Sequence, residues 1–158
     1  MNFLQAVKTA TFLAPGTVAT NATASQRVDT LGYARARVTI LLPAATATDS
    51  TNKLSALALN AGDSTTYAAT NDISGYVGTT NSTATSGTFV IPNYTNTSTG
   101  GRYVLDLPMP PNGRYLFLRY QAAASHSNVA AICQLYNGDQ SPDTATEAGV
   151  DLWVKPGN

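Results

Sequence analysis

The chain has 158 residues, a length that fits one domain and leaves no room for a second full core. Nine basic and nine acidic residues give a formal net charge of zero, and charged residues are 11% of the chain, against about 25% in a typical globular domain. Because this sparse charge forms no basic stripe, we expect neither nucleic acid nor a membrane surface as a partner.

The apolar fraction is ordinary, at 43%, so the missing charge is replaced by small polar and small apolar residues such as Thr, Ser, Asn, Ala and Gly. A surface of this kind has little like-charge repulsion, which favours a chain whose surface is covered by neighbouring subunits. An exported β-rich bacterial protein would have the same composition. No stretch approaches the roughly 20 apolar residues that a membrane-spanning helix requires.

The first 25 residues carry one charge and no sustained periodicity, which predicts an extended N-terminal arm at 1–25 and a β-sandwich domain at 26–158. Exposed large apolar groups would be unfavourable in a free monomer, so we expect the arm to lie along its own domain or along a neighbour. The arm residues expected at such an interface are Phe3, Leu4, Phe12 and Leu13.

A strand is predicted at 33–42, where apolar and polar residues alternate. Ala36, Val38 and Ile40 share one face, and Arg35 and Arg37 share the other. The alternation indicates arginines that face solvent or a subunit rather than a basic cluster that binds nucleic acid.

Further strands are predicted downstream, separated by turn residues that tolerate positive φ, as in the Asn112-Gly113 pair. Their ranges are 53–60, 87–91, 102–107, 114–122, 128–136 and 150–155. Between them, residues 65–86 form a long polar excursion that contains Tyr67 and Tyr76. Several short strands without a helical stretch predict an all-β fold, a single antiparallel β-sandwich that is jelly-roll-like.

The strand at 114–122 has large apolar groups on both faces. One face fills the core, and the other then needs a cover, whether that is the face of Tyr115 and Phe117 or the face of Leu116, Leu118 and Tyr120. The arm, a loop or another subunit could supply that cover. Low charge favours another subunit, which predicts a homo-oligomer that Tyr115, Phe117 and Arg119 contact.

Organised catalytic or metal-binding residues are absent from the sequence. A single histidine, His126, and a single cysteine, Cys133, supply neither a zinc site nor a nucleophilic triad, and the one glutamate is Glu147. Asn137, Asp139 and Asp143 lie in a loop that could hold calcium, but their spacing is not that of an EF-hand. We therefore expect no enzyme activity and no cofactor.

Two segments carry a resemblance to a known family: ARARVTILL at 34–42 and GRYLFLRY at 113–120. With the charge-poor arm, they resemble the capsid cement or decoration proteins of tailed bacteriophages. In that family an early Val-rich strand precedes a Lys-Leu strand, here KLSAL at 53–57, and a later Arg-Tyr-Leu-Arg-like strand precedes an Ala/Val-rich strand, here 128–135. The resemblance covers about 33–137.

The resemblance implies a homotrimer on the outer surface of a phage head, made in the host cytoplasm, whose partner is the major capsid protein. Two alternatives remain open. One is a tail, baseplate or head-fibre component whose long polar loop contacts a glycan or receptor through Tyr67, Tyr76 and Tyr94. The other is an enzyme or a carbohydrate-binding accessory domain, which the single histidine disfavours.

Overall fold

The computed structural model describes residues 8–18, 23–44, 54–80, 83–92, 100–108, 113–122, 126–136 and 152–154. These residues form ten strands and one short 3-10 helix. In chain order, the elements are β1 (Lys8–Val18), β2 (Thr23–Asp29), β3 (Arg35–Leu41), β4 (Leu54–Gly62), η1 (Ala69–Asn71), β5 (Asp72–Thr79), β6 (Thr88–Val90), β7 (Arg102–Pro108), β8 (Tyr115–Ala122), β9 (His126–Tyr136) and β10 (Leu152–Val154).

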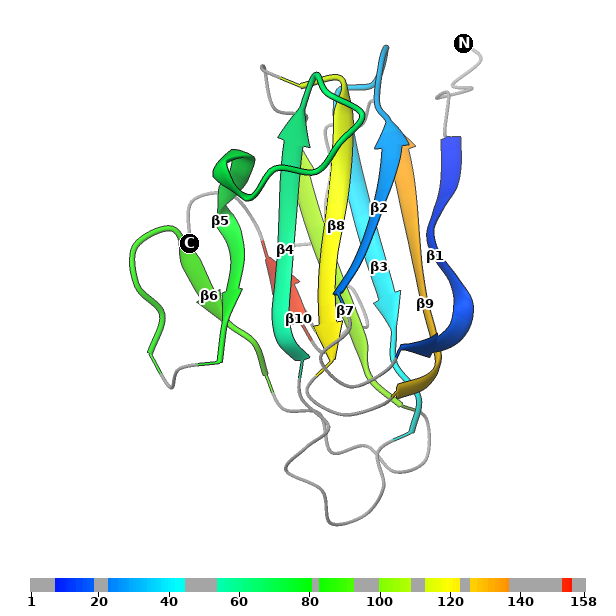
Figure 1. Ribbon diagram of the computed structural model, residues 1–158, viewed down its shortest axis with the longest axis vertical. Coiled ribbons are helices and arrows are strands. Elements are labelled where there is room, and N and C mark those ends of the chain that lie inside the picture. Colours follow the sequence, from blue (N-terminus) through cyan, green and yellow to red (C-terminus); the bar gives the residue numbers. More distant parts are fainter. Residues whose placement is uncertain are drawn as a thin grey trace, which may run out of the picture.

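The strands form two sheets that pack face to face, as Figure 1 shows. The first sheet has the order β1-β9-β3-β7-β10, and the second has the order β2-β8-β4-β5-β6. Neighbouring strands are antiparallel except at two pairs, β5 with β6 and β7 with β10. The expected all-β sandwich is confirmed.

The strand pairing is that of a jelly roll. β1 pairs with β9, β2 with β8, β3 with β7 and β4 with β5, so the chain follows one long antiparallel ribbon that reverses between β4 and β5. Successive pairs of this ribbon belong alternately to the first and the second sheet. Rolling a ribbon in this way produces the two sheets of a jelly roll. The short strand β10 lies at one edge of the first sheet, and the short strand β6 lies at one edge of the second sheet.

The core lies between the sheets, where alternate residues of each strand point inward. On β3, Ala36, Val38 and Ile40 are fully buried while Arg35 and Arg37 point outward, which confirms the predicted alternation. The largest fully buried side chains are Tyr103, Tyr120, Phe12, Ile40, Leu54, Leu57, Leu59, Leu105, Leu107, Leu116, Leu135 and Val38.

Part of the expected arm lies along its own domain as regular structure. β1 pairs with β9 over its length, with register shifts on both sides of Gly16, and Phe12 is 1% exposed within the core. β2 also begins inside the expected arm and forms the edge of the second sheet next to β8. Phe12 is therefore a core residue and not an interface residue, because its ring fills the space between the sheets.

The polar excursion at 65–86 also contains regular structure that its composition did not predict. It includes η1 and β5, and β5 pairs with β4 and β6. Tyr76 of β5 points inward and is 2% exposed, and its hydroxyl donates to the backbone oxygen of Asp106 in the opposite sheet, at 2.6 Å. Tyr76 thus joins the two sheets and is not available to a receptor or glycan.

Candidate functional site

The outer face of the second sheet carries most of the polar and aromatic side chains that could bind a partner. Strand register places four of them in one row across β2, β8, β4 and β5. Arg27 lies opposite Phe117, Phe117 opposite Asn60, and Asn60 opposite Asp72. Residues that face one another across antiparallel strands have neighbouring side chains, so this row forms one continuous surface.

The 63–71 segment, which comprises residues 63–68 and η1, passes over this row. Tyr67 from the segment meets Phe117 edge-on, with ring centroids 6.2 Å apart and an interplanar angle of 73°. Phe117 is only 3% exposed as a result. Phe117, on the outer face of β8, is therefore covered by a loop of the same chain, which is one of the covers that the sequence allowed, and its burial does not require another subunit.

Polar contacts fix the other side of the 63–71 segment to β4 and β5. The amide nitrogen of Asn60 donates to the backbone oxygen of Ala68 and to Asp72 Oδ1, and the Tyr67 hydroxyl donates to the same Asp72 oxygen at 3.2 Å. Burial and the negative charge of Asp72 raise the pKa of the Tyr67 phenol, while Arg119 opposes this shift. Tyr67 is thus a neutral hydrogen-bond donor at ordinary pH.

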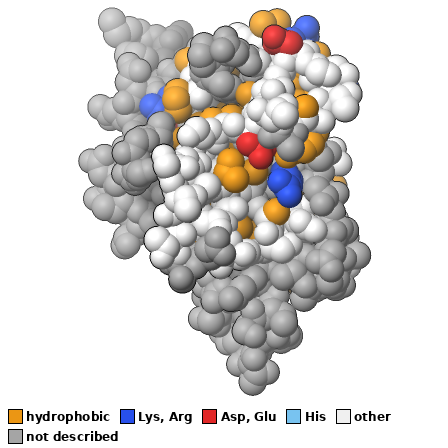
Figure 2. Space-filling model, turned by 60° about the vertical axis from the view of Figure 1, so that its left-hand side comes forward, with side chains coloured by type: hydrophobic (Ala, Val, Ile, Leu, Met, Phe, Trp, Pro, Cys, Tyr) orange, Lys and Arg blue, Asp and Glu red, His pale blue; other side chains and the backbone are white. Residues whose placement is uncertain are grey.

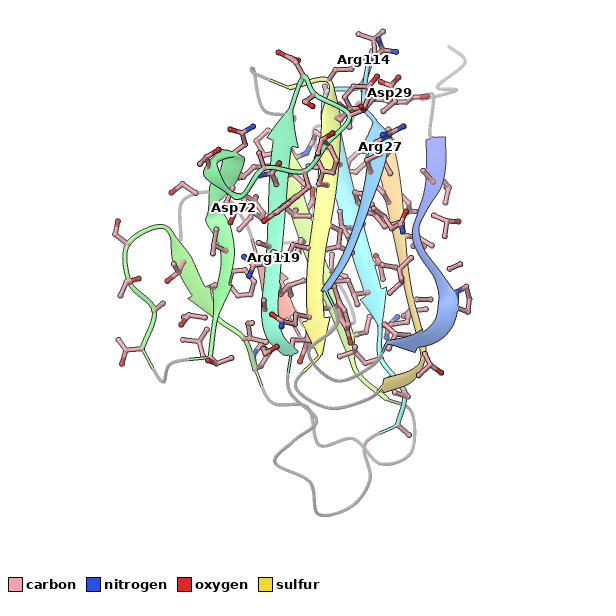
Figure 3. The ribbon with its side chains drawn as sticks, in the orientation of Figure 1. Arg27, Asp29, Asp72, Arg114 and Arg119 are labelled. Carbon is pink, nitrogen blue, oxygen red and sulfur yellow. The ribbon has the colours of Figure 1, made fainter. Side chains whose placement is uncertain are left out.

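An ion pair lies at one end of the same face. The Arg114 guanidinium contacts Asp29 through Nε and Nη2, and the shortest distance joins Nη2 and Oδ2, at 2.7 Å. The Tyr115 ring lies beneath two guanidiniums, with its centroid 5.3 Å from Arg114 Cζ and 5.8 Å from Arg27 Cζ. Figure 3 shows Arg27, Asp29 and Arg114 at this end, whereas Asp72 and Arg119 lie nearer the middle.

A hollow opens between β2 and the 63–71 segment. Its volume is about 540 Å³, and its lining residues are Gln26, Arg27, Thr65, Thr66, Tyr67 and Phe117. Arg27 Nη1 donates to the Thr65 backbone oxygen at 2.8 Å, which holds the guanidinium at the rim. Among the described residues, no carboxylate lies within ion-pair distance of Arg27. The hollow therefore combines aromatic, hydroxyl and cationic groups.

The first sheet carries a separate charge network on its outer face. Asp106 is 1% exposed, and its carboxylate contacts Arg37 Nη2 at 2.8 Å and Arg35 Nη2 at 3.5 Å. The Tyr136 hydroxyl donates to both carboxylate oxygens, at 2.7 and 2.9 Å. Burial, the hydrogen bond to Asp106 and its charge raise the pKa of Tyr136. These contacts give a buried carboxylate the partners that it needs, so we assign the network a role in stability.

The remaining residues expected at an interface lie in different environments. Leu13 is half-buried against the core, and Tyr115 and Arg119 are half-buried on the outer face of the second sheet. Phe3, Leu4 and the proposed loop contact Tyr94 lie outside the described residues.

The described residues hold no group of three or more His, Cys, Asp or Glu side chains that could bind a metal ion. The calcium hypothesis at Asn137, Asp139 and Asp143 falls outside them, as does Glu147. Within the same residues, no helix is long and apolar enough to cross a membrane. Cys133 is buried in the core.

In the described part of the face that Figure 2 shows, most atoms belong to uncharged groups. Hydrophobic side chains form a patch in its described part, and only a few acidic and basic side chains interrupt it. Sequence reasoning missed Arg27, Asp29 and Asp72 as members of the outer face of the second sheet. The alternation of Arg27 and Asp29 with Val28 was a usable signal for the first two, because it places them on one side of a strand.

Comparison with known proteins identifies no relative: no family model, no curated protein and no solved structure matches the chain.

Proposed function

We propose that the chain is a structural virion protein, a cement or decoration protein that binds the outer surface of a phage head and stabilises contacts between major capsid subunits. The jelly-roll topology supports the proposal, because viral capsid domains are one of the groups that use this fold. A fold alone does not determine function. The proposal therefore also depends on the charge and composition of the surface.

The main observation behind the proposal is that charged side chains of the described residues contact other groups of the same chain. Described charged side chains make contacts within the chain: Asp29 with Arg114, Asp106 with Arg35 and Arg37, Asp63 with the backbone of Arg114, Asp72 with Asn60 and Tyr67, and Arg27 with the backbone of Thr65. Most of the exposed residues in the described part of the chain are Thr, Ser, Asn, Ala or Gly. Such a surface offers little repulsion to a closely packed neighbour.

The proposed mechanism is thermodynamic and involves no catalytic residue. A protein that binds the assembled lattice, and not its separated subunits, lowers the free energy of the lattice by its own binding free energy. At a free concentration 100 times the dissociation constant, the gain is about 2.7 kcal/mol for each site.

The resemblance to cement proteins also leads us to propose a homotrimer. The apolar second face of β8 gives this proposal no support, because Tyr67 covers Phe117 within the chain. Light scattering on the purified chain at micromolar concentration, alone and with heads, tests the trimer separately from capsid binding.

Heads that lack the protein provide the test of function. Adding the purified chain should raise the temperature at which these heads release DNA, with an effect that saturates as the surface sites fill. An equal mass of serum albumin serves as the control. A release temperature that is unchanged while the chain binds the heads would contradict the stabilising role.

The hollow beside Tyr67 favours a second candidate, a tail, baseplate or head-fibre component that contacts a glycan. Jelly rolls also occur as lectin domains. The candidate rests on Arg27, Thr65, Thr66 and Tyr67, which present charged, hydroxyl and aromatic groups to one space. Location in the virion separates the two candidates.

A further inference from the structure

The hollow between β2 and the 63–71 segment combines features of a small-molecule site. Its volume of about 540 Å³ lies within the range of 300–1,000 Å³ that is typical of ligand sites. The rings of Tyr67 and Phe117, which meet edge-on, both line it, as do the exposed Thr65 and Thr66. A ligand that fits such a lining has both C–H surface and many hydroxyls.

The charge of the hollow comes from Arg27. On the same face, Asp29 is paired with Arg114, and Asp72 accepts hydrogen bonds from Asn60 and Tyr67. Arg27 has no carboxylate partner among the described residues, although it lines the hollow. The hollow therefore attracts an anion rather than a cation.

Arg27 is also held in place before any ligand arrives. One of its five N–H groups donates to the Thr65 backbone oxygen, at 2.8 Å, and its guanidinium lies over the Tyr115 ring. The other N–H groups form a planar fork that matches a carboxylate. Because the side chain is already positioned, binding has a smaller cost in side-chain entropy.

We propose that this hollow binds a carboxylate-bearing sugar residue, of the uronic acid type found in acidic polysaccharides, with the carboxylate on Arg27 and the ring against Tyr67. The proposal goes beyond the capsid function and does not depend on it. Like the second candidate function, it expects the chain to contact a glycan.

The test is a titration of the isotope-labelled full chain with sodium glucuronate, and separately with glucose, followed by the amide NMR signals of residues 65–67 and Phe117. Glucuronate should shift these signals, and glucose should bind about tenfold more weakly because it lacks the charge that Arg27 recognises. Arg27→Gln should weaken glucuronate binding about tenfold, to the level of glucose. The matched control Arg102→Gln removes an exposed arginine of the first sheet and should leave glucuronate binding unchanged.

Four outcomes would overturn the proposal. They are no shift at residues 65–67 with glucuronate, equal affinity for glucose and glucuronate, an unchanged affinity in Arg27→Gln, and displacement of glucuronate by acetate at equal concentration. Tighter binding of a short oligoglutamate peptide would also overturn it and assign the hollow to a protein partner. Binding of Arg27→Gln to phage heads is measured in parallel, so that failure here is distinguishable from failure of the capsid proposal.

Discussion

Tyr67 covers Phe117, with the two rings edge-on and their centroids 6.2 Å apart. The sequence shows that the second face of β8 needs a cover, and the structure finds that cover 50 residues earlier in the same chain, in the 63–71 segment. The contact buries Phe117 in a single chain. The burial of Phe117 therefore gives no evidence for self-association.

The first prediction concerns this cover. Tyr67→Ala should lower the free energy of unfolding by about 2 kcal/mol, because it removes the aromatic pair and exposes the Phe117 ring. Tyr67→Phe keeps the ring and loses the contacts of the hydroxyl with Asp72 and Arg119, so its cost should be about 1 kcal/mol. Urea denaturation measures both. Equal stability of Tyr67→Ala and the unchanged protein would mean that another group covers Phe117.

The second prediction concerns β1. Phe12→Ala should lower the free energy of unfolding by about 3 kcal/mol, since its ring is 1% exposed between the sheets. Deleting residues 1–18 should destabilise the fold by more, because β9 also loses the strand that pairs with it. Circular dichroism during thermal unfolding measures the change. A truncated chain that unfolds at the original temperature would show that β1 is dispensable, as expected of an arm.

The third prediction compares two carboxylates. Asp106→Ala should cost about 3 kcal/mol, because Arg35, Arg37 and the Tyr136 hydroxyl all lose their buried acceptor. Asp29→Ala breaks an ion pair at the surface, where such pairs contribute about 0.5 kcal/mol. Denaturant unfolding of the two variants side by side makes the comparison. The reverse order of stabilities would be incompatible with a structural role for the Asp106 network.

The fourth prediction is a loss of stability in alkali. Burial, followed by the effect of Asp72 or Asp106, raises the pKa of Tyr67, Tyr76 and Tyr136 above the ordinary value of about 10. Because the unfolded chain loses these protons at lower pH than the folded chain does, the stabilising contribution is complete below about pH 10. It is lost as pH rises further.

Urea midpoints measured from pH 8 to pH 11.5 test the alkaline prediction. The midpoint should be nearly constant at first and fall above about pH 10. Tyr76→Phe removes one of the three groups, so the fall should be shallower in that variant. A midpoint that rises over the same interval would contradict the direction of the three pKa shifts.

The sandwich and its core face were predictable from the sequence because alternation is a local signal. Ala36, Val38 and Ile40 repeat every second residue, and all three are buried. The same logic placed Leu116 and Leu118 on one face of β8, and both lie in the core. Alternation of apolar and polar residues is sufficient to predict a strand and its core-facing residues when one face of the strand is buried and the other is not.

β1 and β5 were not predicted, and the reasons are physical. Pro15 and Gly16 interrupt the pattern of β1, which accommodates them through register shifts at the edge of the sheet. Gly75 and Gly78 lower the strand signal of β5. A Cβ at Gly78 would overlap the Ile91 side chain, so close packing requires glycine there.

The candidate site was less predictable than the fold because its residues come from separate parts of the chain. Arg27, Tyr67, Asp72 and Phe117 become neighbours only when β2, β8, β4 and β5 align in the second sheet. Sequence reasoning identified Tyr67 and Phe117 individually. It had no means to pair them, because the contact depends on how the 63–71 segment folds back over β8.

The location of the protein in purified phage particles tests the capsid proposal most directly. Antibodies raised against the purified chain and detected by gold labelling should bind the head surface in many copies, and particles that lack the protein should not label. Label confined to the tail or baseplate, or particles that contain none of the protein, would contradict the capsid role.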